Sequence, residues 1–123
     1  MRKKLIAAAL IAVAFAGPAR AEFSAKDLLK YYASENTIMK NFAEGLIVGM
    51  ERANWWANKM LILRKNSPFY CQPDNLSLTT DQDADILQSY VSRYPETSIY
   101  PSGNVFLLAL QATFPCPVSG HAN

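Results

Sequence analysis

Residues 37–63 read TIMKNFAEGLIVGMERANWWANKMLIL, and this stretch decides the expected fold class. Apolar and small residues recur in it at alternating steps of three and four, which is the period of one face of an α-helix. The spacing predicts one long helix from Thr37 to about Leu63. The residues that share this face are Met39, Phe42, Leu46, Gly49, Ala53, Trp56 and Met60.

Two glycines, Gly45 and Gly49, stand four residues apart on the predicted helix. Each costs up to about 1 kcal/mol relative to alanine unless a neighbour needs a close approach. The pair therefore predicts a tight crossing with another helix. A membrane dimer motif is excluded, because the charged residues Glu44, Glu51 and Arg52 surround the glycines.

Adjacent tryptophans, Trp55 and Trp56, point about 100° apart on the same helix. We expect both to pack in the core. The alternative is that one of them is an exposed anchor for a protein partner, because interface energy concentrates in Trp, Tyr and Arg.

Helices are also expected on both sides of the long one. A short helix begins at the cap-like Ser24 and ends near residues 34–36. After the turn-forming residues 64–79, Thr79 and Gln82 form a capping-box pattern that opens another helix. This helix is ended by Pro95, and its apolar stripe is Ala84, Leu87, Tyr90, Val91 and Tyr94.

The apolar run Val105–Leu110 follows Pro101, a residue that suits the first turn of a helix. Six consecutive apolar residues fit a buried strand as well. The Leu and Ala content and the continuation into Gln111 and Ala112 favour a buried helix. The expected fold is therefore all-α, a small bundle of about four to five helices tied by a single disulfide.

The first 21 residues have the three parts of an export signal. Arg2–Lys4 is cationic, Leu5–Ala16 is apolar, and Ala19–Ala21 fits a cleavage site before Glu22. A membrane anchor needs about 20 apolar residues, and this run is shorter. We therefore expect a cleaved signal peptide and a periplasmic protein.

The remaining chain is expected to hold one helical domain, residues 22–116, and a flexible tail, residues 117–123. Once the four basic residues of the signal are lost, 8 basic and 10 acidic side chains remain, a net charge of −2. That balance excludes the basic surface of a nucleic-acid-binding protein. The absence of a second long apolar stretch argues against membrane insertion after cleavage.

Cys71 and Cys116 are the two cysteines of the chain, and export places them in an oxidising compartment. Two cysteines allow one intramolecular pairing, so we expect a disulfide. Closing this loop stabilises the fold by roughly 4 kcal/mol in the chain-entropy model. The alternative is a nucleophilic cysteine, which would need the single histidine, His121 in the tail, as its base.

The sequence offers almost no catalytic chemistry. Asp81-x-Asp83-x-Asp85 resembles the start of a calcium loop, which needs glycine at its sixth position and glutamate at its twelfth. Those positions are Ile86 and Ser92, so an acidic helix N-terminus exposed to solvent is favoured. No catalytic residue, metal site or cofactor is expected, and the chain is not expected to be an enzyme.

Several spaced motifs between residues 42 and 116 form a set. They are Phe69-Tyr70-Cys71-Gln72-Pro73, a Thr-led helix with Gln82, Tyr94-Pro95-Glu96, Phe106–Leu110 and Phe114-Pro115-Cys116, preceded by Gly45–Ala53. The set resembles the pattern of the Rap/Tai immunity proteins. The chain departs from that pattern in the extra Tyr70, in Ser102-Gly103 where small alanines are usual, and in lacking a cysteine that many members carry before the glycine.

The resemblance implies an all-α fold, a disulfide between Cys71 and Cys116, and a function. Rap/Tai proteins are periplasmic proteins that neutralise peptidoglycan amidase toxins delivered by type VI secretion. Inhibition by capping the active-site cleft of the toxin is therefore implied, with a cognate amidase effector as the partner. A homodimer is a further candidate assembly.

The competing interpretation is an acid-stress chaperone of the Hde type, or another non-enzymatic periplasmic binding protein. Such chaperones are also small, exported, helical and tied by one disulfide, and they expose apolar surface in acid. The single histidine lies in the tail, so an obvious sensor near pH 6 is missing, although carboxylates could serve at lower pH.

The connection between Pro95 and Pro101 is the first candidate for contacting the partner. An inhibitor that blocks a cleft needs a restrained segment, because ordering a loose loop costs affinity, and proline bounds this one on both sides. Its residues are Glu96, Thr97, Ser98, Ile99 and Tyr100. The alternative is an ordinary connection in which the last two side chains fold back onto the core. The second candidate surface is the acidic face of Asp81, Asp83 and Asp85.

Overall fold

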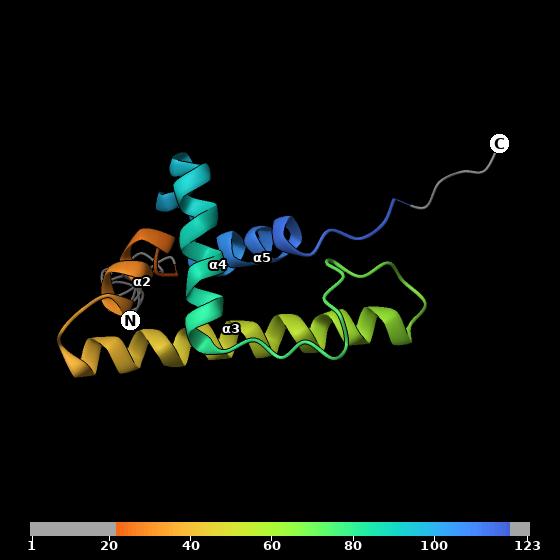
Figure 1. The fold of residues 1–123 in the computed structure, drawn as a ribbon, viewed down its shortest axis with the longest axis horizontal. Coiled ribbons are helices and arrows are strands. Elements are labelled where there is room, and N and C mark those ends of the chain that lie inside the picture. Colours follow the sequence, from red (N-terminus) through yellow and green to blue (C-terminus); the bar gives the residue numbers. More distant parts are fainter. Residues whose placement is uncertain (1–21, 119–123) are drawn as a thin grey trace, which may run out of the picture.

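The computed structural model describes residues 22–118, which form a bundle of four α-helices and one 3-10 helix without a strand (Figure 1). The helices are α2 (Ala25–Tyr32), α3 (Thr37–Leu63), α4 (Thr80–Arg93), the 3-10 helix η1 (Pro95–Ile99) and α5 (Ser102–Thr113). This confirms the all-α fold and the expected order of helices. The expected signal segment, residues 1–21, and residues 119–123 of the expected tail lie outside the described residues.

Side-chain caps explain where the first three helices begin. The Ser24 hydroxyl accepts a hydrogen bond from the backbone N–H of Asp27, and the Asn36 side chain accepts from two N–H groups of α3. Thr79 and Gln82 form the predicted reciprocal capping box at the start of α4. Each cap satisfies backbone N–H groups that have no partner inside the helix.

The core forms where α2, α4 and α5 pack on the N-terminal half of α3. In Figure 1, α3 is the longest element, α4 stands across it, and the C-terminal half of α3 extends beyond the other helices. α5 contributes Val105, Phe106, Ala109 and Leu110 to the core, so the apolar run is the buried helix that its composition favours. The other fully buried large side chains come from α2, α3 and α4: Leu28, Ile47 and Leu87.

The buried face of α3 is not the face that the periodicity singled out. Its buried residues are Ala43, Ile47 and Asn58. Among the residues of the predicted stripe, only Leu46 packs against the core; the others are exposed. The helix carries apolar residues on two sides, and its period gives no information on which side the other helices cover.

Two further expectations about α3 are wrong for the same reason. Gly45 and Gly49 are exposed, and within the described residues no tight helix crossing is formed at either of them, since a Cβ built there meets no atom within 4 Å. Trp55 is half-buried, but Trp56 is exposed. The prediction that both tryptophans pack in the core therefore fails at Trp56.

The long connection between α3 and α4 is tied to the end of α5. Cys71 and Cys116 form the expected disulfide, with their Cα atoms 4.8 Å apart. Beside it, the backbone N–H of Cys71 donates to the carbonyl oxygen of Phe114 at 2.8 Å. Residues 64–79 are thereby held next to the projecting half of α3, which they follow back to the start of α4 (Figure 1).

Candidate protein-binding surfaces

The segment between α4 and α5 is a short rigid turn with an exposed apolar tip. The N–H and the hydroxyl of Thr97 both donate to the carbonyl oxygen of Tyr94, at 2.9 and 2.7 Å, and Thr97 is buried. Ile99 and Tyr100 are 72% and 52% exposed, so they do not fold back onto the core. Glu96 is also exposed, and Ser98 is half-buried. Four of the five residues proposed from the sequence therefore reach the surface together.

The first described residues of the chain hold this segment from the other side. The N–H of Ala25 donates to the carbonyl oxygen of Tyr100 at 3.0 Å, and the N–H of Ser102 donates to the carbonyl oxygen of Phe23 at 2.7 Å. These two bonds form a small antiparallel bridge between Ser24 and Pro101. The C-terminal end of η1 is thus held by its chain connection to α5 and by hydrogen bonds to the backbone of Phe23 and Ala25.

Glu22 caps α5 from a distance of 80 positions in the sequence. Its carboxylate accepts the N–H of Gly103 at 2.9 Å and the hydroxyl of Ser102 at 3.3 Å. A negative charge is favourable at a helix N-terminus, and α5 has no side-chain cap of its own. A Cβ at Gly103 would lie 2.7 Å from a carboxylate oxygen of Glu22, so glycine leaves room for this cap. The sequence contained no local signal for it.

The three aspartates at the start of α4 do not share one exposed surface. Asp81 is exposed and accepts a hydrogen bond from the hydroxyl of Tyr32, which together with burial raises the pKa of Tyr32 to about 12. Asp85 is exposed as well. Asp83 is only 2% exposed, so the expectation of an acidic face in solvent is wrong at this residue. It points inward because it lies four residues before Leu87 on the buried side of α4.

Asp83 is a buried carboxylate without sufficient partners. Within the described residues its Oδ1 atom has no hydrogen-bond partner. Burial, with a smaller contribution from the charge of Glu51 on α3, raises the pKa of Asp83 to about 7. Tyr70 of the connection is also buried, and burial together with the charges of Glu51 and Asp83 raises the pKa of Tyr70 to about 12. Burial and the neighbouring carboxylates therefore disfavour the charged forms of Asp83 and Tyr70.

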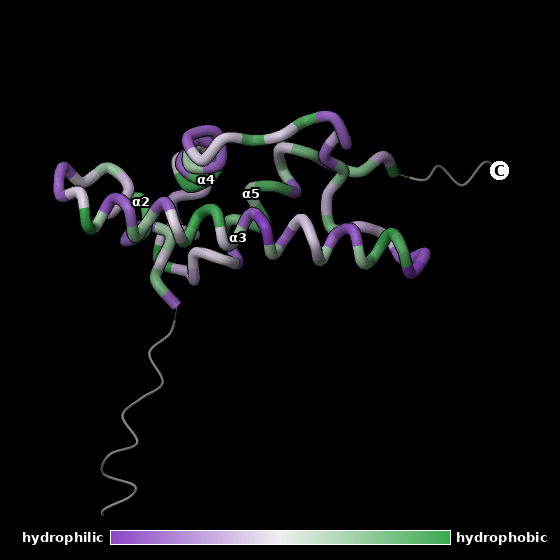
Figure 2. The backbone as a smooth tube through the Cα atoms, turned by 90° about the horizontal axis from the view of Figure 1, so that it is seen from below, coloured by the Kyte–Doolittle hydropathy of each residue, from purple (hydrophilic) through white to green (hydrophobic). Residues whose placement is uncertain are grey.

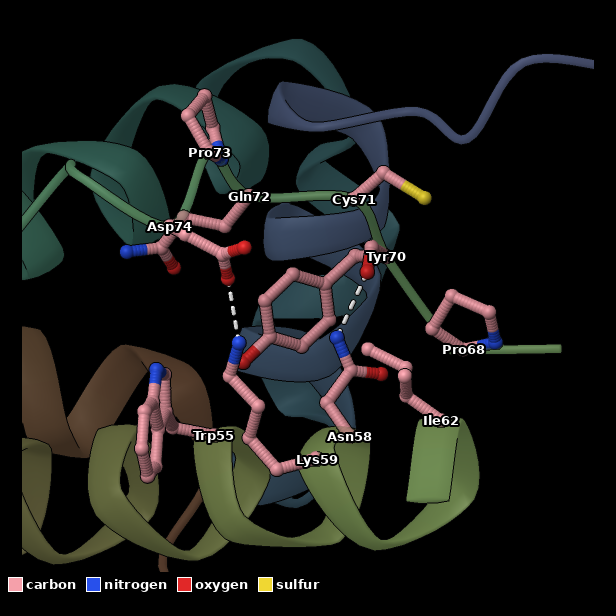
Figure 3. Close-up of a pocket in the computed structure, with 10 residues that line it drawn as sticks. All are labelled: Trp55, Asn58, Lys59, Ile62, Pro68, Tyr70, Cys71, Gln72, Pro73 and Asp74. Atoms are coloured by element: carbon pink, nitrogen blue, oxygen red, sulfur yellow. Dashed lines mark hydrogen bonds and ion pairs between the residues drawn. The ribbon is translucent and has the colours of Figure 1, made fainter. Parts of the chain in front are cut away.

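An open pocket of about 190 Å³ lies between the projecting half of α3 and the connection (Figure 3). Asn58 joins its two walls, because its amide donates to the carbonyl oxygen of Tyr70 at 2.6 Å and accepts the N–H of Phe69 at 2.7 Å. Lys59 pairs with Asp74 across the pocket and lowers the pKa of that carboxyl. Sequence reasoning missed Asn58, because nothing in the local sequence distinguishes it from the other polar residues of α3.

The side of α3 that faces away from the other helices, which is turned toward the viewer in Figure 2, carries several exposed apolar side chains. We call it the outer face. Its large side chains are Ile38, Phe42, Trp56, Met60 and Leu63, all of them exposed, and Gly45 and Gly49 lie between them. Phe23 packs against Phe42 at the N-terminal end, with ring centroids 5.5 Å apart.

Among residues 22–118, no group of three or more His, Cys, Asp or Glu side chains is placed to hold a metal ion. In the same part of the chain, no helix is long and apolar enough to cross a membrane. What the fold presents is a small helical domain, tied by a disulfide, with a rigid apolar tip at one end of α4 and an apolar helix face at the other.

The described residues thus form a small helical domain tied by one disulfide, and comparison with known families identifies the family. The sequence model of the Rap1a immunity proteins matches residues 24–116. The chain belongs to this family, and the match runs from the cap of α2 to the second cysteine of the disulfide. Searches of curated proteins and of solved structures found no match.

Proposed function

We propose that this chain is a periplasmic immunity protein that binds and inhibits a peptidoglycan amidase delivered by type VI secretion. Membership of the Rap1a immunity proteins supports a role in neutralising a toxin. The amidase and the secretion route come from the resemblance of the spaced motifs to Rap/Tai proteins. The export signal expected at residues 1–21 supports action in the periplasm, where peptidoglycan lies.

The observation that carries a mechanism is the exposure of Ile99 and Tyr100 on a segment that is already ordered. A partner that inserts an apolar tip into a cleft gains affinity when the tip is rigid before binding, because little conformational entropy is lost. The hydrogen bonds of Thr97 and the bridge between Ser24 and Pro101 supply this rigidity. Inhibition then follows from filling the cleft, and the immunity protein itself needs no catalytic group.

The test starts from the genes next to this one: a peptidoglycan amidase encoded there should bind the chain, as measured by calorimetry, and should lose its activity on peptidoglycan when the chain is added. Tyr100→Ala and Ile99→Ala should each weaken binding by more than about 1 kcal/mol, as expected for anchor residues. Phe69→Ala is the matched control, because Phe69 is a similarly exposed aromatic residue on the α3–α4 connection.

Thr97 calls for a separate variant, because its side chain is buried and shapes the turn. Thr97→Val removes the hydroxyl that bonds to Tyr94, so it should weaken binding because the turn becomes less rigid, and not because a direct contact with the partner is lost. Unchanged affinity in all three segment variants, with helicity and melting temperature preserved, would move the interface away from η1. Absence of binding by the wild-type chain to the neighbouring amidase would contradict the proposed function itself.

A further inference from the structure

Residues 72–78 of the connection follow α3 as a segment that is fixed at both ends, and we call this segment the strap. Before it, Cys71 is tied by the disulfide to Cys116 and by its N–H to the carbonyl oxygen of Phe114. After it, Thr79 is fixed by the capping box of α4. The two ends therefore act as anchors, and the strap moves only as a loop between them.

Between its anchors the strap is held weakly. The N–H of Leu76 donates to the carbonyl oxygen of Pro73 at 3.0 Å, so this hydrogen bond stays within the strap. In the described part of the chain, no backbone hydrogen bond joins the strap to α3. Asp74 pairs with Lys59 of α3, but Asp74 is exposed, and an ion pair in solvent stabilises little. Apart from this pair, the main attachment is Leu78, which is half-buried against the core.

An open pocket of about 220 Å³ lies between the strap and α3. Glu51, Arg52 and Trp55 of α3 form one wall, and residues of the strap form the other. Trp55 is half-buried and also lines the pocket of Figure 3, where its ring stands beside Lys59. The space beneath the strap therefore gives solvent a route to Glu51, and a movement of the strap changes the exposure of Trp55.

A buried carboxyl group stands beyond this space. Asp83 is 2% exposed, its Oδ1 atom has no hydrogen-bond partner in the described chain, and the charge of Glu51 acts on it. Its N–H donates to the carbonyl oxygen of Thr79 at 3.0 Å, so Asp83 is bonded to the residue that anchors the strap. A carboxylate buried without partners is strongly disfavoured in its charged form. Asp83 therefore ionises readily only when water reaches it.

None of the elements packed against α4 supplies a cation for Asp83. α5 has no charged residue, and Tyr70 of the connection is neutral, because its pKa is about 12. From α3, Glu51 is the charged group that acts on Asp83, and its neighbour Arg52 is exposed to solvent. The remaining charged residues of α2, α4 and η1 are all exposed: Lys26, Asp27, Lys30, Asp81, Asp85, Arg93 and Glu96.

From this arrangement we infer that the strap is a proton-controlled cover, which lies closed over α3 while Asp83 is protonated and lifts when Asp83 ionises. Lifting lets water reach the carboxylates of Asp83 and Glu51, and it exposes Trp55. The surface between α3 and the connection thereby depends on the pH of the surroundings. The device concerns the conformation of the chain itself and does not depend on the identity of the effector.

Raising the pH should open the strap, because the open form releases its proton first. The pKa of Asp83 is about 7 in the closed form, compared with an ordinary value of 3.8 for a carboxyl in water. The ratio of open to closed forms therefore rises with pH between these two values and levels off above about pH 7. From pH 5 to pH 8 the ratio would rise up to about a hundredfold.

Acrylamide quenching of Trp55 fluorescence measures the opening in the mature chain. The chain has two tryptophans, so Trp56→Phe serves as the parent in which Trp55 is the single indole. Acrylamide is uncharged, and its quenching constant should rise about twofold from pH 5 to pH 8, with a plateau above about pH 7. Asp83→Asn should remove this rise. Asp85→Asn is the matched control on the same helix and should retain it.

Glu51→Gln tests the same mechanism without touching Asp83. It removes the neighbouring charge, so the pKa of Asp83 in the closed form falls, and the rise in quenching should be smaller and level off at a lower pH. The circular dichroism of the helices should stay constant across the range, because only the strap moves. Constant quenching in the parent, a rise that persists in Asp83→Asn, or a rise that accompanies loss of helical signal would each overturn the proposal.

Discussion

Replacing Asp83 by asparagine should stabilise the folded protein near neutral pH. The pKa of the buried carboxyl is about 7, compared with an ordinary value of 3.8. The folded state therefore binds a proton more tightly than the unfolded state does. Between pH 4 and pH 7 the folded protein holds more protons, so its free energy of unfolding falls as the pH rises through this window.

The size of the effect follows from the shift. About three pKa units correspond to roughly 4 kcal/mol at 1.36 kcal/mol per unit, which is an upper limit because water and small movements relax a buried charge. The asparagine side chain occupies nearly the same space and carries no charge, so Asp83→Asn should be more stable than wild type by about 1–3 kcal/mol at pH 8. At pH 4, where the carboxyl is protonated, the two proteins should be nearly equal.

The assay is urea denaturation followed by circular dichroism at several pH values from 4.5 to 8. The difference in free energy of unfolding between wild type and Asp83→Asn reports the titration of Asp83. The other titratable groups coupled to it, Glu51 of α3 and Tyr70 of the connection, are present in both proteins. Asp85→Asn, two residues further along α4 and exposed, is the matched control and should follow wild type. Parallel pH profiles for wild type and Asp83→Asn would refute the argument.

Three further changes test other parts of the fold. Cys71→Ser should lower the free energy of unfolding by about 3–4 kcal/mol by freeing the unfolded chain, and a melting temperature within a degree or two of wild type would show that the disulfide is dispensable. Asn58→Ala should cost about 2–3 kcal/mol because the carbonyl of Tyr70 and the N–H of Phe69 both lose their partner, with faster amide exchange at Phe69, whereas normal protection there would contradict the role of this amide. Glu22→Ala should cost about 1 kcal/mol through loss of the cap on α5, read from thermal melts. The intact mass of the protein isolated from the periplasm should correspond to a chain that begins at Glu22 and has no free thiol. Alkylation of two thiols without prior reduction would contradict the predicted disulfide.

Much of the fold was determined by the sequence through local chemistry. Ser24, Asn36 and Thr79 start helices because their side chains bond to N–H groups within the next three residues, and Pro95 ends α4 because it cannot continue a helix. Such interactions span only a few positions, so they can be recognised in the chain itself. The disulfide was predictable because two cysteines allow one pairing.

The tertiary structure alone decided which surfaces are covered. A helix period shows that Phe42 and Trp56 share a face, but burial depends on where α2, α4 and α5 dock, which is set by contacts between residues far apart in sequence. The same distant packing buries Asp83 in a sequence that resembles an exposed helix start, and it leaves Ile99 in solvent. The sequence therefore predicted which segments form helices and turns, but not which of their side chains are exposed. Local sequence patterns determine where an element begins and ends, whereas only the docking of whole helices determines which side of each element is covered.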